Sequence, residues 1–270
     1  MLSSPWIAAL VALFFWWFAT GAILVAVRRA DREGAKARLW AVLWNLPFLL
    51  LGGFGFLDTL GNNSVAGAYV GFLSALALWG WIELAFLTGV ITGPVRQPLK
   101  AGVREWERFI RAWGTIAYHE MLLAFTLLAM IAASYGADNK FGMWTFAVLF
   151  AARVSAKLNL YLGVRKINVE FIPEHLNHLP SHFRIARMNW LFPISITGLS
   201  FALACFLERI WAVETQADIV GFALLSALTA LALLEHWFMV LPLPDEKLWR
   251  WMLAERTMPN QAIKTSEDAR

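Results

Sequence analysis

The sequence predicts an all-α fold: a polytopic transmembrane helical bundle of about seven spans, with the N-terminus outside and the C-terminus in the cytoplasm. Three observations support this prediction. Hydrophobic residues make up 59% of the 270 residues and charged residues 16%, against roughly 25% charged residues in ordinary globular proteins. Long apolar segments recur along the chain, and basic residues gather in alternate loops between them. Because short basic loops orient a membrane protein, the net charge of +4 does not indicate nucleic-acid binding.

A transmembrane helix needs about 20 mainly apolar residues. Seven windows meet this requirement: 6–27, 39–60, 66–93, 113–134, 142–164, 189–212 and 219–241. The first window is longer than the apolar core of a signal peptide and has no Lys or Arg before it, so we expect a retained helix. The second contains Asn45, Pro47 and three glycines, which predict a kink or close packing against a neighbouring helix.

Basic residues set the predicted orientation. Nineteen of the 23 Lys and Arg residues lie in the first, third and fifth loops or in the tail, whereas Lys140 and Arg209 lie on the opposite side. Cytoplasmic loops are enriched in Lys and Arg, so we expect these three loops and the tail in the cytoplasm. We expect one transmembrane domain over residues 1–258, with cytoplasmic interfacial helices, and a flexible cytoplasmic tail over 259–270.

Two stretches beside the spans predict the interfacial helices. In residues 99–113 an apolar stripe recurs at spacings of three and four: Leu99, Val103, Trp106, Ile110 and Trp113. The basic residues lie away from that stripe: Lys100, Arg104, Arg108 and Arg111. This pattern is typical of a helix that lies in the membrane surface. Residues 244–253 predict a second such helix, because Asp245 and Glu246 favour its first turn.

Ionisable residues inside the predicted spans are the candidate functional residues. There are seven of them: Glu83, His119, Glu120, Arg153, Lys157, Glu235 and His236. Each charge costs about 2.5–3.5 kcal/mol at a helix centre on insertion scales, so such residues usually face the protein interior. At about 1.5 Å of rise per residue they fall in the cytoplasmic half of the membrane. We expect one intramembrane polar pocket; the alternatives are ion pairs that only fix helix packing, and charges that reach out to the membrane surface.

Five histidines raise the question of a metal or a pigment. His119 and His236 are candidate axial ligands for a tetrapyrrole, either bacteriochlorophyll or haem, since neutral imidazole at membrane depth binds both. His175, His178 and His182 form a sparse version of the clusters that bind iron in membrane oxygenases. Pro180 interrupts a continuous helix there, so the sequence disfavours a metal. Cys205 is expected to be a buried apolar-type residue, and no nucleophile elbow, P-loop or dinucleotide motif is present.

Four phrases of the sequence carry a family resemblance: YHE at 118–120, KLNLYLGV at 157–164, EFIPEHLNHLPSHF at 170–183 and LLEHWFMVLPLPDEKLWRWM at 233–252. The chain resembles, over nearly its full length, the PuhE family of photosynthetic complex assembly proteins of phototrophic bacteria. The resemblance implies a role in building the reaction centre and light-harvesting complex, linked to bacteriochlorophyll production. It carries over no catalytic residues.

The leading hypothesis is a non-enzymatic assembly factor in the lipid bilayer of the bacterial cytoplasmic membrane, including any photosynthetic intracytoplasmic membrane. Its expected partners are reaction-centre or light-harvesting subunits, other assembly factors, or a pigment. One alternative is a metalloenzyme of the hydroxylase or oxygenase type that acts on a pigment or lipid precursor. Another is a porphyrin or lipid transporter, which needs polar access from the outer face; Asn45 and Asp58 are the hints of that.

Overall fold

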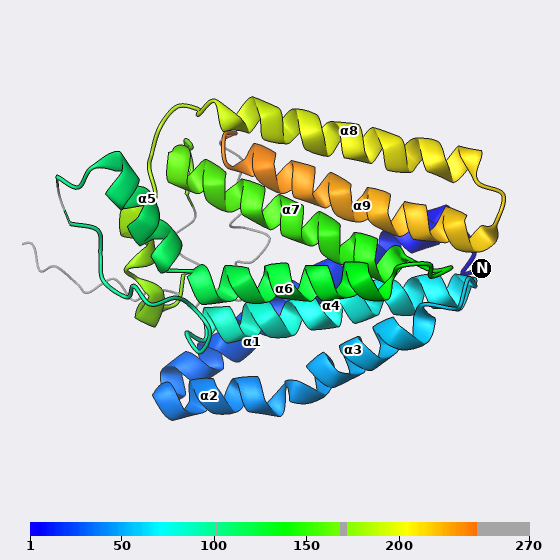
Figure 1. The fold of residues 1–270 in the computed structure, drawn as a ribbon, viewed down its shortest axis with the longest axis horizontal. Helices are drawn as coiled ribbons and strands as arrows, with labels where there is room; N and C mark the ends of the chain where they lie inside the picture. The colour runs from blue at the N-terminus through cyan, green and yellow to red at the C-terminus, as the bar shows by residue number, and fades with distance from the viewer. Residues whose placement is uncertain (101, 168–171, 242–270) are drawn as a thin grey trace, which may run out of the picture.

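The computed structural model describes residues 1–100, 102–167 and 172–241, and in these ranges the chain is a bundle of α-helices (Figure 1). The helices are α1 Pro5–Glu33, α2 Ala35–Trp44, α3 Leu46–Thr59, α4 Val65–Leu87, α5 Glu105–Gly114, α6 Ala117–Ala133, α7 Phe141–Leu162, α8 Leu191–Ala212 and α9 Gln216–Phe238, with short 3-10 helices η2 Glu174–Leu176 and η3 Leu179–His182. Among the described residues, six segments are long and apolar enough to cross a membrane: α1, α2 with α3, α4, α7, α8 and α9. The bent pair α5 and α6 makes a seventh if the two helices are counted as one span. The predicted multi-pass helical bundle is therefore confirmed.

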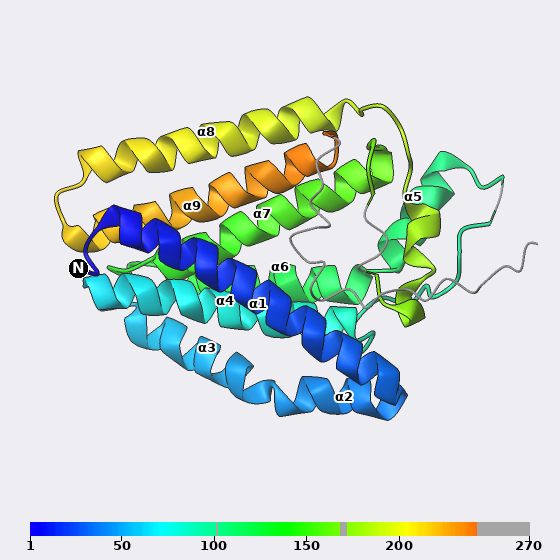
Figure 2. The same ribbon diagram turned by 180° about the vertical axis from the view of Figure 1, so that it is seen from behind.

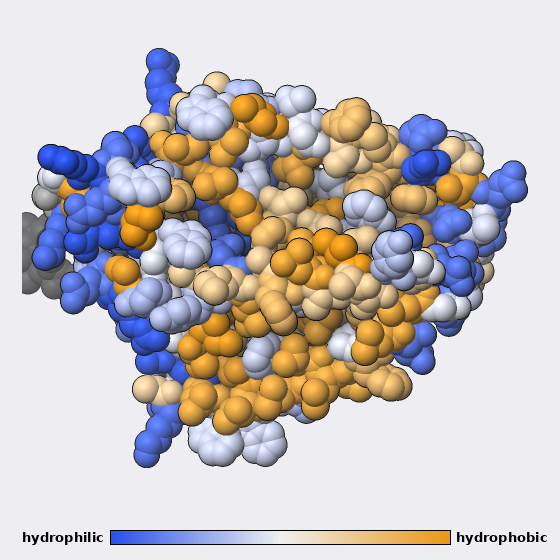
Figure 3. Space-filling view, viewed as in Figure 1, coloured by the Kyte–Doolittle hydropathy of each residue, from blue (hydrophilic) through white to orange (hydrophobic). Residues whose placement is uncertain are grey.

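The surface of the bundle agrees with a membrane setting. Figure 3 shows hydrophobic side chains across the middle of one face and hydrophilic side chains toward both ends. On α3, for example, Phe48, Leu51 and Phe54 are all more than half exposed. Apolar side chains exposed in this number favour contact with lipid rather than with water. The sidedness of the bundle stays a prediction from the basic loops.

α4 and α9 form the centre of the bundle, because far more of their residues are buried than in the other spans. Phe72 and Leu76 of α4 pack with Leu224 and Leu228 of α9 and with small residues of α1. Figure 2 shows α1 crossing the back of these helices, while α3 and α8 lie on opposite flanks. α8 buries little, and Cys205 on it is exposed. The expectation that Cys205 is buried is therefore wrong, because α8 turns most of its surface outward.

The second span is broken at Asn45, as its sequence predicts. Asn45 ends α2 and its side-chain Nδ2 donates to the Ala41 carbonyl at 2.8 Å. The next helix packs tightly on α4. A Cβ on Gly52 would lie 2.9 Å from the Ser74 carbonyl oxygen, whereas a Cβ on Gly53 would meet nothing within 4 Å. Both the predicted break and the predicted close packing are confirmed.

The interfacial helix before α6 is shorter than the sequence predicts. It begins at Glu105 because Gly102 has φ +77° and Arg104 is extended, so Leu99 and Val103 lie outside it. α5 then meets α6 at a bend of 68°. α5 lies at the end of the bundle that also carries η2 and η3 (Figure 1). We call this end, with α5, η2 and η3, the basic end. The helix predicted over 244–253 and the tail over 259–270 lie outside the described residues.

Candidate functional site

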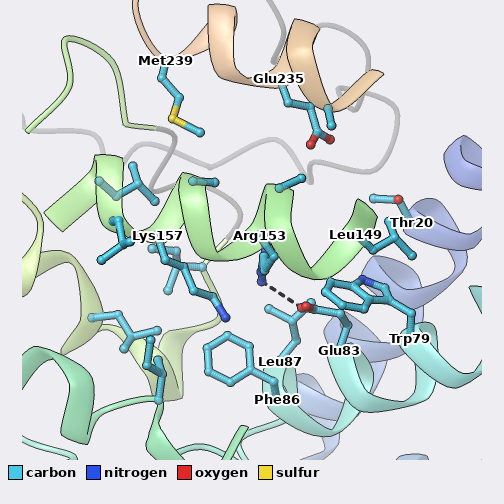
Figure 4. Close-up of a pocket in the computed structure, with 18 of the residues that line it drawn as sticks. Thr20, Trp79, Glu83, Phe86, Leu87, Leu149, Arg153, Lys157, Glu235 and Met239 are labelled. Atoms are coloured by element: carbon cyan, nitrogen blue, oxygen red, sulfur yellow. Dashed lines mark hydrogen bonds and ion pairs between the residues drawn. The ribbon is translucent and has the colours of Figure 1, made fainter. Parts of the chain in front are cut away.

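The candidate site is a cavity of about 600 Å³ in the half of the bundle toward the basic end. α1, α4, α7 and α9 form its side walls, and α5 with residues 172–183 lines the basic end. Aromatic and aliphatic side chains make up most of the walls, among them Trp16, Trp79, Phe86 and Leu149. Figure 4 shows the charged side chains of this wall, which come from α4, α7 and α9. The cavity is within the size range of small-molecule sites, roughly 300–1,000 Å³.

Arg153 and Glu83 form the ion pair at the centre of the polar wall. Arg153 Nη2 of α7 donates to Glu83 Oε2 of α4 at 2.8 Å (Figure 4). The Glu83 side chain is 9% exposed, whereas the Arg153 side chain is 36% exposed where it lines the cavity. The carboxylate is therefore held by the protein, and part of the guanidinium remains accessible to a molecule in the cavity.

A second ion pair lies one helical turn away. Lys157 Nζ of α7 donates to Glu120 Oε1 of α6, and the ammonium lies 5.3 Å from the centre of the Phe86 ring. His119 lies between the two pairs, with Nε2 3.7 Å from Glu83 Oε1 and 3.9 Å from Glu120 Oε1. The structure thus gathers five of the seven residues named from the sequence into one row across α4, α6 and α7.

Glu235 and His236 face different environments, because neighbouring residues on a helix point about 100° apart. Glu235 lines the cavity, and Figure 4 shows its carboxylate pointing from α9 toward α7. It makes no hydrogen bond or ion pair within the described ranges. His236 is 1% exposed and packs between helices: its Nδ1 donates to the Ala232 carbonyl and its Nε2 accepts from the Ser155 hydroxyl, both at 2.8 Å.

Neither of the two candidate axial ligands lines the cavity in this arrangement. An axial ligand needs a free imidazole nitrogen that faces the macrocycle. Both His236 nitrogens already have partners. His119 is fully buried, its ring lies 4.4 Å from the Phe86 ring centre, and neither histidine lines the cavity. A tetrapyrrole in the cavity would contact its walls rather than these two imidazoles.

The three histidines at the basic end do not share one helical face. His175 lies in η2 and His182 ends η3, so the single helical face that would bring them together does not form. His175 Nδ1 contacts Asp31 Oδ1 at 2.7 Å, and His182 Nε2 lies 3.5 Å from the Gln97 carbonyl. In the described ranges, no three His, Cys, Asp or Glu residues are arranged to hold a metal ion. The arrangement of these residues therefore contradicts the hypothesis that His175, His178 and His182 bind one metal ion.

The structure buries Arg108, in contrast to the sequence prediction. It was expected on the solvent face of the interfacial helix, but it is 7% exposed. Its Nη2 donates to the carbonyls of Tyr161 at 2.7 Å and His182 at 3.1 Å. Arg108 therefore ties α5, α7 and η3 together beside the cavity. No spacing rule distinguishes it from Arg104, which is exposed.

Comparisons with known proteins cover the whole of this arrangement. A family model described as "Protein of unknown function (DUF3623)" matches residues 2–260. A protein of Rhodobacter capsulatus, "Uncharacterized 30.4 kDa protein in puhA 5'region", is 51% identical over 262 residues, which are 97% of this chain and 96% of the relative. No solved structure matches. The similarity therefore extends over every helix that lines the cavity.

Proposed function

Because the chain belongs to the DUF3623 family of proteins of unknown function, we propose its role from a relative and from the geometry of the cavity. We propose that it is a membrane assembly factor for the bacterial photosynthetic reaction centre and light-harvesting complex. The observation that carries the proposal is the relative from the puhA 5' region, since puhA belongs to the photosynthetic reaction-centre gene cluster. Identity of 51% over 97% of this chain supports a common role. The PuhE resemblance agrees with it.

The cavity supports a specific part of that role, the holding of an amphiphilic membrane molecule. Its aromatic and aliphatic walls suit an apolar body, and Arg153 and Glu235 offer a donor and an acceptor for a polar group. Pockets of this kind bind ligands through apolar area and orient them through a few polar contacts. Bacteriochlorophyll or a lipid has this chemistry, and such a molecule would contact the walls.

The ion pairs give the cavity a stable polar wall. Charges in the membrane are tolerated when they are paired with one another in the bundle interior. Glu83 balances Arg153, and Glu120 balances Lys157. With both cations paired, the wall favours a ligand whose polar group is neutral or zwitterionic over a free multivalent anion. The metalloenzyme and transporter alternatives have no comparable support in the described residues.

The experiment deletes the gene in a phototrophic bacterium that carries it and restores it as wild type or as one of two variants. Ala156→Phe fills the cavity from α7, while Ala151→Phe adds the same side chain to the exposed face of the same helix. Absorption spectra of membranes measure assembled complexes, and extraction measures total bacteriochlorophyll. We expect the deletion to lower assembled complexes, and wild type and Ala151→Phe to restore them while Ala156→Phe does not. Unchanged photosynthetic complexes in the deletion strain would overturn the proposal.

A further inference from the structure

A second, much smaller hollow lies at the basic end. Its volume is about 70 Å³, well above the roughly 10–15 Å³ that a cavity needs to hold one water molecule. Mainly polar residues line it: Arg38, Thr88, Gly89, Thr92, Arg96, His175, Leu176 and His178. Arg38 lies near the start of α2. Residues 88–96 belong to the loop after α4, and residues 175–178 belong to η2 and the turn that follows it. Three separate segments thus bring donors to one small space.

Several polar atoms around this hollow are buried without a partner in the described part of the chain. They are Thr92 Oγ1, His175 Nε2 and His178 Nε2. Thr92 is 3% exposed and His178 is 5% exposed. A buried donor or acceptor left unsatisfied costs about 1–3 kcal/mol, so three such atoms on residues that line one space favour a bound polar group. The Thr92 hydroxyl and the neutral His178 ring can each donate one hydrogen bond.

The charge of the hollow is positive. Arg38 Nη1 donates to Asp31 Oδ1 at 3.1 Å, and the same oxygen contacts His175 Nδ1 at 2.7 Å. One carboxylate therefore serves two basic side chains. Arg96 is exposed and makes no ion pair with the described residues. Burial first, and then the positive groups of His182, Arg96 and His175, lower the pKa of His178.

The backbone of Gly89 keeps the hollow open beside His175. Gly89 has φ +74°, which favours glycine, and a Cβ there would lie 2.6 Å from His175 Cδ2 and 2.9 Å from Nε2. Any other residue would push the ring away. The polypeptide is therefore shaped to present this imidazole edge next to the two guanidinium groups.

We propose that this hollow binds a single phosphate group, from a free phosphate anion or from a phospholipid headgroup. Guanidinium, imidazole and hydroxyl donors are the usual partners of phosphate oxygens. Four donor side chains line the hollow, Arg38, Thr92, Arg96 and His178, which suits the four oxygens of a tetrahedral phosphate better than the two of a carboxylate. The site is separate from the intramembrane ion pairs and does not depend on the proposed assembly role.

The test compares Arg96→Gln with Arg104→Gln, two exposed arginines of the same loop that lose the same charge. Purified protein in neutral detergent is titrated with inorganic phosphate, and with chloride at equal ionic strength, while the midpoint of thermal unfolding is followed. In a second arm, delipidated protein is given phosphatidylglycerol or a phosphate-free glycolipid with the same chains, and native mass spectrometry counts retained lipid. Thr92→Val removes one hydroxyl with little change of shape.

Removal of one charge-assisted contact is expected to weaken binding roughly tenfold in Arg96→Gln, with a smaller loss in Thr92→Val and no loss in Arg104→Gln. Stabilisation by inorganic phosphate identifies the free anion as the source. Retention of phosphatidylglycerol alone identifies the headgroup. The proposal is wrong if wild type responds to neither ligand, or if Arg104→Gln weakens binding as much as Arg96→Gln.

Discussion

The guanidinium carbon of Arg108 lies 4.0 Å from the centre of the Tyr161 ring. The same side chain donates to the Tyr161 carbonyl, so one residue of α7 receives both a cation–π contact and a charge-assisted hydrogen bond. A third contact, to the His182 carbonyl, reaches η3. The segments joined here are 53 and 74 residues from Arg108 in sequence, and together they line the basic end of the cavity.

Arg108→Met is predicted to loosen this end of the protein. Hydrogen bonds to charged groups contribute about 1.5–3 kcal/mol each, and two carbonyls lose their donor, so we expect the free energy of unfolding to fall by about 3–6 kcal/mol. Limited proteolysis between residues 172 and 190 should accelerate. The exposed Arg104→Met is the control. Equal protease resistance in the two variants would show that Arg108 does not hold η3 in place.

The ion pair between Glu83 and Arg153 is predicted to couple α4 to α7. Breaking a buried pair costs about 3–5 kcal/mol, but Arg153 is about one-third exposed, so we expect about 1–3 kcal/mol for Glu83→Gln. A double-mutant cycle with Arg153→Met measures the coupling by denaturant titration in micelles. We expect the second substitution to recover part of the loss. Strict additivity of the two effects would contradict a direct interaction.

Glycine packing between α3 and α4 gives a matched pair of variants. Gly52→Ala places a Cβ 2.9 Å from a backbone oxygen of α4, which cannot move away as a side chain can. We expect a loss of about 1–3 kcal/mol from this overpacking. Gly53→Ala, one residue along the same helix, meets open space and should be neutral or stabilising by about 0.5–1 kcal/mol. Thermal unfolding of the two variants distinguishes them, and similar effects would argue against close contact.

The histidines at the basic end predict a pH dependence of stability. Burial is the main cause that lowers the pKa of His178 and of His182; positive neighbours add to it for His178, and Arg108 and Arg111 do so for His182. The folded state then prefers the neutral rings, so their contribution is complete above the ordinary value of 6.5 and is lost as pH falls below it. The loss is at most about 1.4 kcal/mol per pH unit for each histidine, and it ends where the pH reaches the lowered pKa of the folded state.

The measurement is denaturant titration of wild type and of the double variant His178→Asn with His182→Asn, between pH 8 and 5. A phosphate-free buffer avoids binding at the small hollow. The double variant should show the shallower dependence. Identical curves for the two proteins would show that these rings do not change protonation on unfolding.

The sequence was a good guide wherever hydropathy or helical geometry decides the outcome. The six to seven spans follow from the length of the apolar segments. The break at Asn45 follows from the combination of Asn45, Pro47 and the glycines within the second span. The gathering of Glu83, Arg153 and Lys157 into one layer follows from depth, because rise per residue is fixed in a helix. Depth does not determine the rotation of a helix about its axis, so the sequence could not show that His236 faces away from the cavity.

The basic end was harder to predict because its contacts join residues far apart in the chain. Nothing local shows that Arg108 is buried, since its partners are carbonyls of α7 and η3. Asn159 is similar: it is fully buried and donates to Ser195 Oγ of α8 at 2.9 Å. The histidine segment was misread because an i, i+3, i+7 pattern implies a shared face only in a continuous helix, whereas this segment forms two short 3-10 turns.

The ion pairs also impose an order on biogenesis. Ribosomes make the acid-bearing helices first: Glu83 precedes Arg153 by 70 residues, and Glu120 precedes Lys157 by 37. α4 and α6 therefore reach the membrane before α7, which carries the cations that neutralise them. Their apolar residues must carry each carboxyl group into the bilayer, or the helices must wait at the exit site. Emergence of α7 then neutralises both acids and completes the bundle interior.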